Sequence, residues 1–143
     1  MPGQGVIARN LTLKSHFGAS KHASALTTLY FALFRGSPVA GGVEPDGTGA
    51  YTRVPKTNDA TLWGTIASTD TILVNKGTSG AIVWPSTTGL YSVTLDLDWW
   101  AVYDLSAGGV LWYWGQLQTP IRVTAAGNTP RIPANSLTMS QLE

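Results

Sequence analysis

The segment from Leu95 to Leu117 constrains the fold of this chain most, because it holds two apolar runs joined by small residues. The joining residues are Ser106-Ala107-Gly108-Gly109, and five of the six tryptophans fall between Trp84 and Trp114. Two apolar runs around a glycine-containing turn predict a β-hairpin. We therefore expect this hairpin near the core of an all-β domain.

Turn residues recur at short intervals after Phe17, and no helical periodicity follows that residue. This pattern predicts a single domain over residues 10–143, either a β-sandwich or jelly-roll-like; spacing alone does not separate Greek-key from jelly-roll topology. The run Tyr91–Leu97 alternates apolar and polar residues, as a half-buried strand does. The expected strands are Leu26–Phe34, Tyr51–Pro55, Thr61–Ile66, Thr71–Asn75, Ala81–Trp84, Tyr91–Leu97, Trp99–Tyr103, Val110–Leu117, Thr119–Thr124 and one within Ile132–Met139.

The N-terminal residues have a different predicted structure from the rest of the chain. We expect residues 1–9 to form a flexible arm that can order against a neighbour. Asn10 as N-cap and Gly18 beyond the C-terminus predict a short helix ending near Phe17. The alternative is a strand over Val6–Leu13, where apolar and polar residues also alternate.

Composition limits the partners. The 143 residues fit one domain. The charged fraction is 12%, about half the usual ~25%. Either an oligomer or lattice covers part of the surface, or uncharged polar residues form it. The net charge is +1 without a basic run, which disfavours nucleic acid. No signal peptide or membrane-spanning run is apparent, so we expect no membrane partner. The absence of cysteine excludes disulfides and thiolate metal sites.

Titratable residues form no convincing catalytic or metal-binding pattern. His16 and His22 lack an acid–serine partner in the sequence, and we expect surface or capping roles for both. Asp96 and Asp98 would share a strand face about 6–7 Å apart, which is compatible with glycoside hydrolysis or Ca²⁺ binding. A solvated strand face, with Asp104 opening the turn, is the simpler interpretation. We expect no catalytic residue, no metal and no cofactor.

The tryptophans of the hairpin allow more than one role. Adjacent Trp99 and Trp100 must point to opposite faces of a strand, whereas Trp112 and Trp114 share a face. Both faces of the hairpin are therefore apolar and need cover. Either all the rings are core, or one aromatic face contacts another subunit; a carbohydrate platform is a further possibility.

The order and spacing of several elements resemble a family of small virion proteins of tailed bacteriophages, over about residues 11–142. This family includes tail-fibre-like proteins and β-sandwich capsid decoration proteins. Each element is weak by itself, and the sequence departs from the family at Asp96–Trp100 and over residues 57–75. The matching elements are Leu13–Gly18 leading to Thr28–Phe34, Gly49-Ala-Tyr51-Thr-Arg53, Val83-Trp84-Pro85, Ala101–Gly115, Thr119–Val123, Ala126-Gly-Asn128 and Ile132–Leu137.

The resemblance implies a non-enzymatic virion structural protein, assembled in the host cytoplasm. With the small size and low charge, it favours a capsid decoration (cement) protein that is oligomeric and binds the major capsid protein. The alternative is a tail component, a fibre, baseplate or adsorption module, touching other tail proteins or host glycan. A glycan hydrolase using Asp96 and Asp98 is a third reading. The partner-contact residues we expect are Gly3, Val6, Ile7, Arg9, Val39, Val43 and Trp100.

Overall fold

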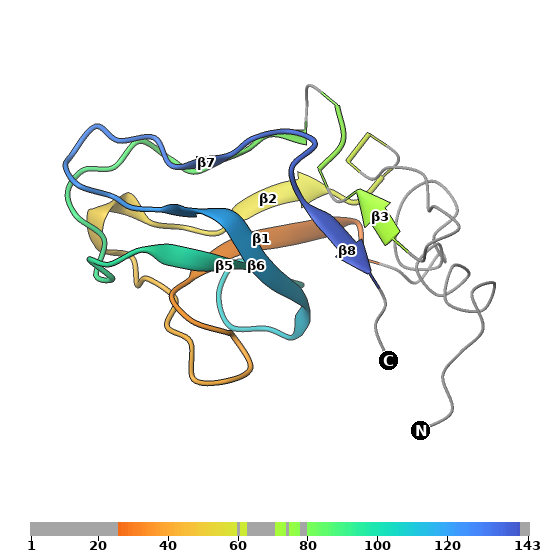
Figure 1. Ribbon diagram of the computed structural model, residues 1–143, viewed down its shortest axis with the longest axis horizontal. Coiled ribbons are helices and arrows are strands. Elements are labelled where there is room, and N and C mark those ends of the chain that lie inside the picture. The colour runs from red at the N-terminus through yellow and green to blue at the C-terminus, as the bar shows by residue number, and fades with distance from the viewer. Residues whose placement is uncertain (1–25, 60, 63–70, 74, 78–79, 141–143) are drawn as a thin grey trace. The chain divides into compact units, whose positions relative to one another are not determined.

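The computed structural model describes residues 26–59, 61–62, 71–73, 75–77 and 80–140 (Figure 1). Its elements are β1 (Thr28–Phe34), the 3₁₀ turn η1 (Thr48–Ala50), β2 (Val54–Thr57), β3 (Thr71–Leu73), β4 (Ile82–Val83), β5 (Leu97–Tyr103), β6 (Leu111–Ile121), β7 (Arg131–Ile132) and β8 (Thr138–Ser140). The described chain contains no α-helix, and its strands pair in antiparallel fashion wherever the register is defined. The all-β class is thereby confirmed, whereas the sandwich or jelly-roll arrangement stays a prediction.

The chain divides into two compact units. One comprises residues 28–56 and 82–132, and the other comprises residues 1–27, 57–81 and 133–143. The single domain over residues 10–143 stays a prediction, as does the arm over residues 1–9. The arm, the helix expected after it and most of Thr61–Ile66 lie outside the described residues.

The unit of residues 28–56 and 82–132 is built on a four-stranded sheet in the order β2-β1-β5-β6. Strands β1 and β5 are antiparallel, with Phe31 opposite Val102 and Leu33 opposite Trp100. These four side chains are at most 2% exposed and lie on one face of the sheet. Both β1 and β5 are apolar on both faces, which suits central strands. The predicted strand over Leu26–Phe34 and the predicted hairpin are confirmed.

The opposite face of the same sheet is covered differently. Its central row is Ala32 opposite Ala101, and both are fully buried. Phe34 and Tyr103 belong to the rows on either side, and their rings stack at 6.3 Å between centroids. Small residues in the middle therefore let the flanking rings close over the backbone.

A two-stranded ribbon of β4 and β7 completes this unit. Ile82 and Ile132 lie opposite each other and are buried. The Trp84 backbone N–H donates to the carbonyl oxygen of Pro130 at 2.9 Å, and the Trp84 side chain is 1% exposed. Figure 1 shows this ribbon running above the four-stranded sheet.

In the other unit, β3 and β8 pair with Ile72 opposite Met139. Buried Asn75 holds the segment before β8: its Nδ2 donates to the Pro133 carbonyl at 2.6 Å. Its Oδ1 accepts from the backbone N–H groups of Ser136 and Leu137. One amide side chain thus satisfies three backbone groups that have no strand partner.

Three strand predictions are wrong. In place of the strand expected over Tyr51–Pro55, β2 begins at Val54 and continues through Pro55 to Thr57. Residues Tyr91 to Asp96 form no strand, and β5 begins at Leu97. Leu95 is 43% exposed, whereas Tyr91 is buried because its ring packs edge-on against Tyr51 at 5.2 Å. The alternation thus reflects separate local contacts. The expected strand Thr119–Thr124 is not separate either, because β6 continues through Pro120 to Ile121.

Candidate functional site

The most connected polar group of the sheet unit is the Arg53 cluster, consisting of Arg53, Glu44, Tyr51 and Tyr103. Arg53 precedes β2 and its side chain is 7% exposed. Its Nε and one terminal nitrogen each donate to a different oxygen of the Glu44 carboxylate at 2.8 Å. The guanidinium also stacks on the Tyr103 ring, with 3.6 Å from Cζ to the ring centroid. A bidentate, stacked geometry of this kind requires arginine.

The cluster joins three segments that are distant in sequence. The second terminal nitrogen of Arg53 donates to the carbonyls of Leu105 and Gly108 at 3.0 and 2.7 Å, in the turn between β5 and β6. The Tyr51 hydroxyl donates to Glu44 and accepts the backbone N–H of Leu33 in β1, both at 3.0 Å. The hairpin turn, the loop before η1 and β1 are therefore bound to one charged centre.

The electrostatics of the cluster suit a permanent ion pair. Burial raises the pKa of the Tyr51 hydroxyl, and the neighbouring Glu44 carboxylate raises it further, so Tyr51 stays a neutral donor. Burial alone would lower the pKa of Arg53, but its hydrogen bonds and the charge of Glu44 raise it overall. Arg53 makes four hydrogen bonds to acceptors within the protein, and the Tyr51 hydroxyl makes a fifth to Glu44. The ion pair and hydrogen bonds of the Arg53 cluster hold loops together.

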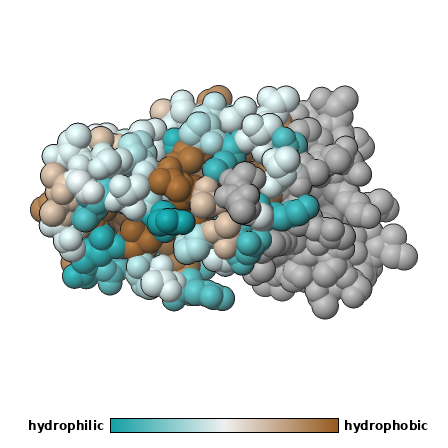
Figure 2. Space-filling model, turned by 90° about the horizontal axis from the view of Figure 1, so that it is seen from above, coloured by the Kyte–Doolittle hydropathy of each residue, from teal (hydrophilic) through white to brown (hydrophobic). Residues whose placement is uncertain are grey.

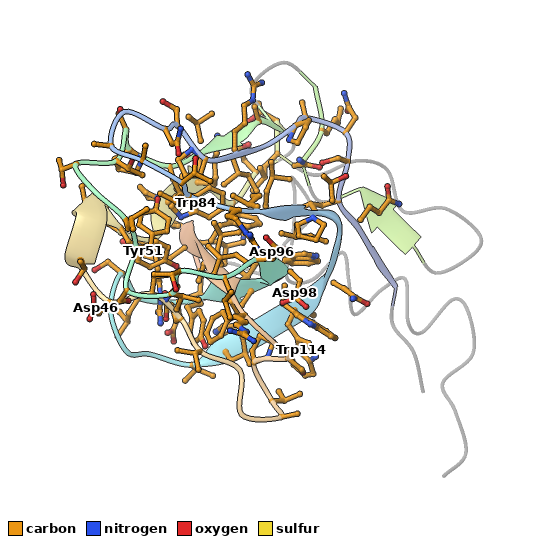
Figure 3. The ribbon with its side chains drawn as sticks, turned by 60° about the vertical axis from the view of Figure 1, so that its left-hand side comes forward. Asp46, Tyr51, Trp84, Asp96, Asp98 and Trp114 are labelled. Carbon is orange, nitrogen blue, oxygen red and sulfur yellow. The ribbon has the colours of Figure 1, made fainter. Side chains whose placement is uncertain are left out.

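The aspartates of the hairpin region are each engaged in the fold. Asp96 lies outside β5 and its Oδ1 accepts from Arg122 Nε at 2.6 Å. Asp98 Oδ1 accepts the backbone N–H of Gly36 at 2.8 Å. Asp96 therefore does not share a strand face with Asp98, which corrects the basis of the paired-carboxylate interpretation; Figure 3 labels both residues.

Asp104 opens the hairpin turn as expected, because its Oδ1 accepts the Val110 backbone N–H at 2.7 Å. Within the described ranges, no group of three or more His, Asp or Glu side chains is arranged to hold a metal ion. His16 and His22 lie outside these ranges. No helix in the described part of the chain is long and apolar enough to cross a membrane.

The hairpin tryptophans separate into buried and exposed rings. Trp99 packs against Ala32 and Ala101, whereas Trp100 stacks on Phe31 at 6.5 Å on the other face, so their predicted opposition is confirmed. Trp114 is 42% exposed. Figure 3 shows Trp114 at the edge of the side chains, while Tyr51 and Trp84 lie among them.

The expected contact residues fall into three groups. Val39 and Val43 lie in the loop after β1 and are 57% and 55% exposed. Trp100 is 2% exposed, and the backbone of Gly115 passes so close that a Cβ there would lie 2.7 Å from Trp100 Nε1. Its ring is thus committed to packing within the sheet, and among the described residues the exposed indoles are those of β6. The residues outside the described ranges are Gly3, Val6, Ile7 and Arg9.

Sequence reasoning did not find the Arg53 cluster. Its only local signal was the Gly49-Ala-Tyr51-Thr-Arg53 element, which places a tyrosine and an arginine two residues apart. The carboxylate partner is nine residues away, and the carbonyl partners are 52 and 55 residues away. No spacing rule links residues at such separations.

An antiparallel all-β fold whose described polar clusters bind loops together is typical of structural and binding proteins. Comparison with known families makes this more specific: residues 7–140 match the family described as Podophage GP4 fiber I protein gp80. The chain belongs to this family. The match confirms the resemblance to virion proteins of tailed phages. A search of curated proteins finds no match.

Proposed function

We propose that this protein is a non-enzymatic structural component of the tail fibre apparatus of a podophage. The observation that carries the proposal is the family match over residues 7–140, which spans every described strand. The family is named for a fibre protein, so it supports the tail-component alternative better than capsid decoration. The protein would accordingly reside in the virion.

The geometry of the Arg53 cluster supports a structural role. Its ion pair is buried at the arginine end, so salt screens it weakly. It fixes the hairpin turn and the loop carrying Val39 and Val43 to the sheet through a single side chain. Loops fixed in this way offer a constant surface for assembly.

The exposed side chains of that loop are the proposed contacts with neighbouring subunits or other tail proteins. Val39 and Val43 are more than half exposed, and burying the exposed part of each side chain would stabilise an interface by roughly 1 kcal/mol. On the face seen in Figure 2, hydrophobic surface occurs as patches interrupted by pale and hydrophilic surface. The N-terminal residues Gly3, Val6, Ile7 and Arg9 remain further proposed contacts.

Fractionation of virions tests the assignment. Heads and tails are separated after disruption of purified particles, and the protein is quantified in each fraction and located by immunogold labelling. We expect it with the tails and absent from tailless heads. Saturable binding to tailless heads, with none in the tail fraction, would instead establish capsid decoration.

A matched pair of variants tests the loop contacts. We expect Val39→Asp to abolish incorporation into particles while leaving the purified protein folded. Leu90→Asp is the control, because Leu90 is also exposed, at 47%, but belongs to a different loop. Equal incorporation of both variants would place the contact elsewhere.

A further inference from the structure

Strand β6 presents two exposed indole rings along one face. Trp112 and Trp114 are 37% and 42% exposed, and they are two residues apart. Gln116, two residues further, is also exposed and lies opposite Trp99. We call Trp112, Trp114 and Gln116 the aromatic stripe. The register shift between Val102 and Tyr103 places a β-bulge at Trp112, and bulges re-aim side chains.

The stripe is uncharged. The eleven residues of β6, Leu111–Ile121, include no Asp, Glu, Lys or Arg. Strand β6 also ends the order of the four-stranded sheet, a position where charged side chains commonly discourage association. Its exposed surface instead combines two indole side chains with the amide of Gln116. A ligand that suits this surface has to be neutral, with both apolar and hydrogen-bonding parts.

The backbone beneath the stripe is held in place. Gly115, between Trp114 and Gln116, lies against the Trp100 ring closely enough to exclude a Cβ. Trp100 is buried and stacks on Phe31. The strand that carries the exposed rings therefore rests on a packed aromatic layer, so the entropy lost on binding is small.

Pyranose sugars fit this chemistry. One face of such a ring is lined by C–H bonds, which lie against the electron-rich face of an indole, and its hydroxyls exchange hydrogen bonds with an amide. Side chains two residues apart on a strand are about 6–7 Å apart, a spacing that lets neighbouring sugar rings of one chain each meet an indole. We propose that the aromatic stripe binds a neutral glycan chain. This goes beyond the proposed structural role and does not depend on it.

Titration of the full-length protein tests the proposal. The probes are maltohexaose, cellohexaose and N-acetylchitohexaose, followed by calorimetry and tryptophan fluorescence. We expect saturable binding of at least one probe with a change in indole emission. Trp114→Ala should weaken that binding about tenfold or more, as loss of an aromatic anchor does. Val110→Ala is the matched control, because Val110 is 58% exposed but precedes β6, and its affinity should be unchanged.

Two further measurements keep the result interpretable. Thermal unfolding of Trp114→Ala shows that it is folded, which we expect for a ring that is 42% exposed. Sedimentation of the wild type and Trp114→Ala reports self-association. Absence of binding for all three probes, equal affinity of Trp114→Ala, or self-association that disappears in Trp114→Ala would each overturn the proposal. A tail location without glycan binding would leave the proposed function intact.

Discussion

Replacing Arg53 by methionine tests how the hairpin is held. Methionine keeps an unbranched apolar side chain but removes the guanidinium. The variant loses two hydrogen bonds to Glu44 and one each to the carbonyls of Leu105 and Gly108. It also loses the cation stacked on Tyr103.

The expected loss of stability in Arg53→Met follows from the burial of the Arg53–Glu44 ion pair. Removing one partner of a buried ion pair typically costs about 3–5 kcal/mol. Glu44 is 21% exposed and keeps the Tyr51 hydroxyl, so water can partly solvate the remaining carboxylate. We therefore expect a loss near the lower end, about 3 kcal/mol in the free energy of unfolding. That is a large fraction of the ~5–15 kcal/mol of a typical domain.

The assay is urea unfolding followed by tryptophan fluorescence, with hydrogen exchange of the turn amides between β5 and β6. Arg122→Met is the control, because the Arg122–Asp96 pair is 51% exposed at both side chains and should contribute at most about 1 kcal/mol. High salt should reduce the effect of Arg122→Met and leave that of Arg53→Met nearly unchanged. The reasoning is refuted if Arg53→Met destabilises the protein no more than Arg122→Met does.

Two further pairs of variants test packing and burial. Gly115→Ala should lower the free energy of unfolding in urea by about 1–3 kcal/mol, because its Cβ would meet the Trp100 ring. Gly47→Ala is the control and should change stability little, because a Cβ at position 47 would have no atom within 4 Å. Tyr91→Phe should leave the free energy of unfolding unchanged or raise it, because the buried Tyr91 hydroxyl has no hydrogen-bond partner among the described residues. Tyr51→Phe removes two hydrogen bonds and should lower the free energy of unfolding by about 1–3 kcal/mol. Burial raises the pKa of Tyr91 to about 12, above its unfolded value near 10. The free energy of unfolding should therefore be unaffected by this group below pH 10 and should fall as pH rises from about 10 through about 12. Tyr91→Phe should reduce that fall, and an unchanged pH profile would contradict this.

The sequence pattern predicted correctly those features that depend on neighbouring residues in the chain. The run Thr28–Phe34 is aromatic and β-branched and ends at a turn, and it forms β1. The glycines at 108 and 109 both have positive φ, which fits a turn that few other residues tolerate. The opposition of Trp99 and Trp100 follows from strand geometry alone.

The sequence pattern did not predict which apolar side chains of the hairpin region are buried. The hairpin tryptophans are alike in sequence, but Trp100 is buried with the Gly115 backbone against its ring, whereas Trp114 is exposed. The alternation of Tyr91–Leu97 suggested a strand, but Leu95 faces solvent and Asp96 bonds to Arg122. Which apolar residue is covered is a property of contacts between distant segments, and a single sequence does not report it.

The Arg53 cluster and the aromatic stripe are connected through the hairpin. The turn between β5 and β6 contains Gly108 and Gly109, whose backbones have little intrinsic preference for one conformation. The buried Arg53 guanidinium compensates by donating hydrogen bonds to two carbonyls of that turn. Because β6 begins directly after the turn, the position of Trp112 depends on where Arg53 holds it. Arg53→Met should therefore weaken glycan binding as well as lower stability, while Arg122→Met should leave binding unchanged; if Arg53→Met binds as the wild type does, the stripe is positioned by Trp100 and β5 alone.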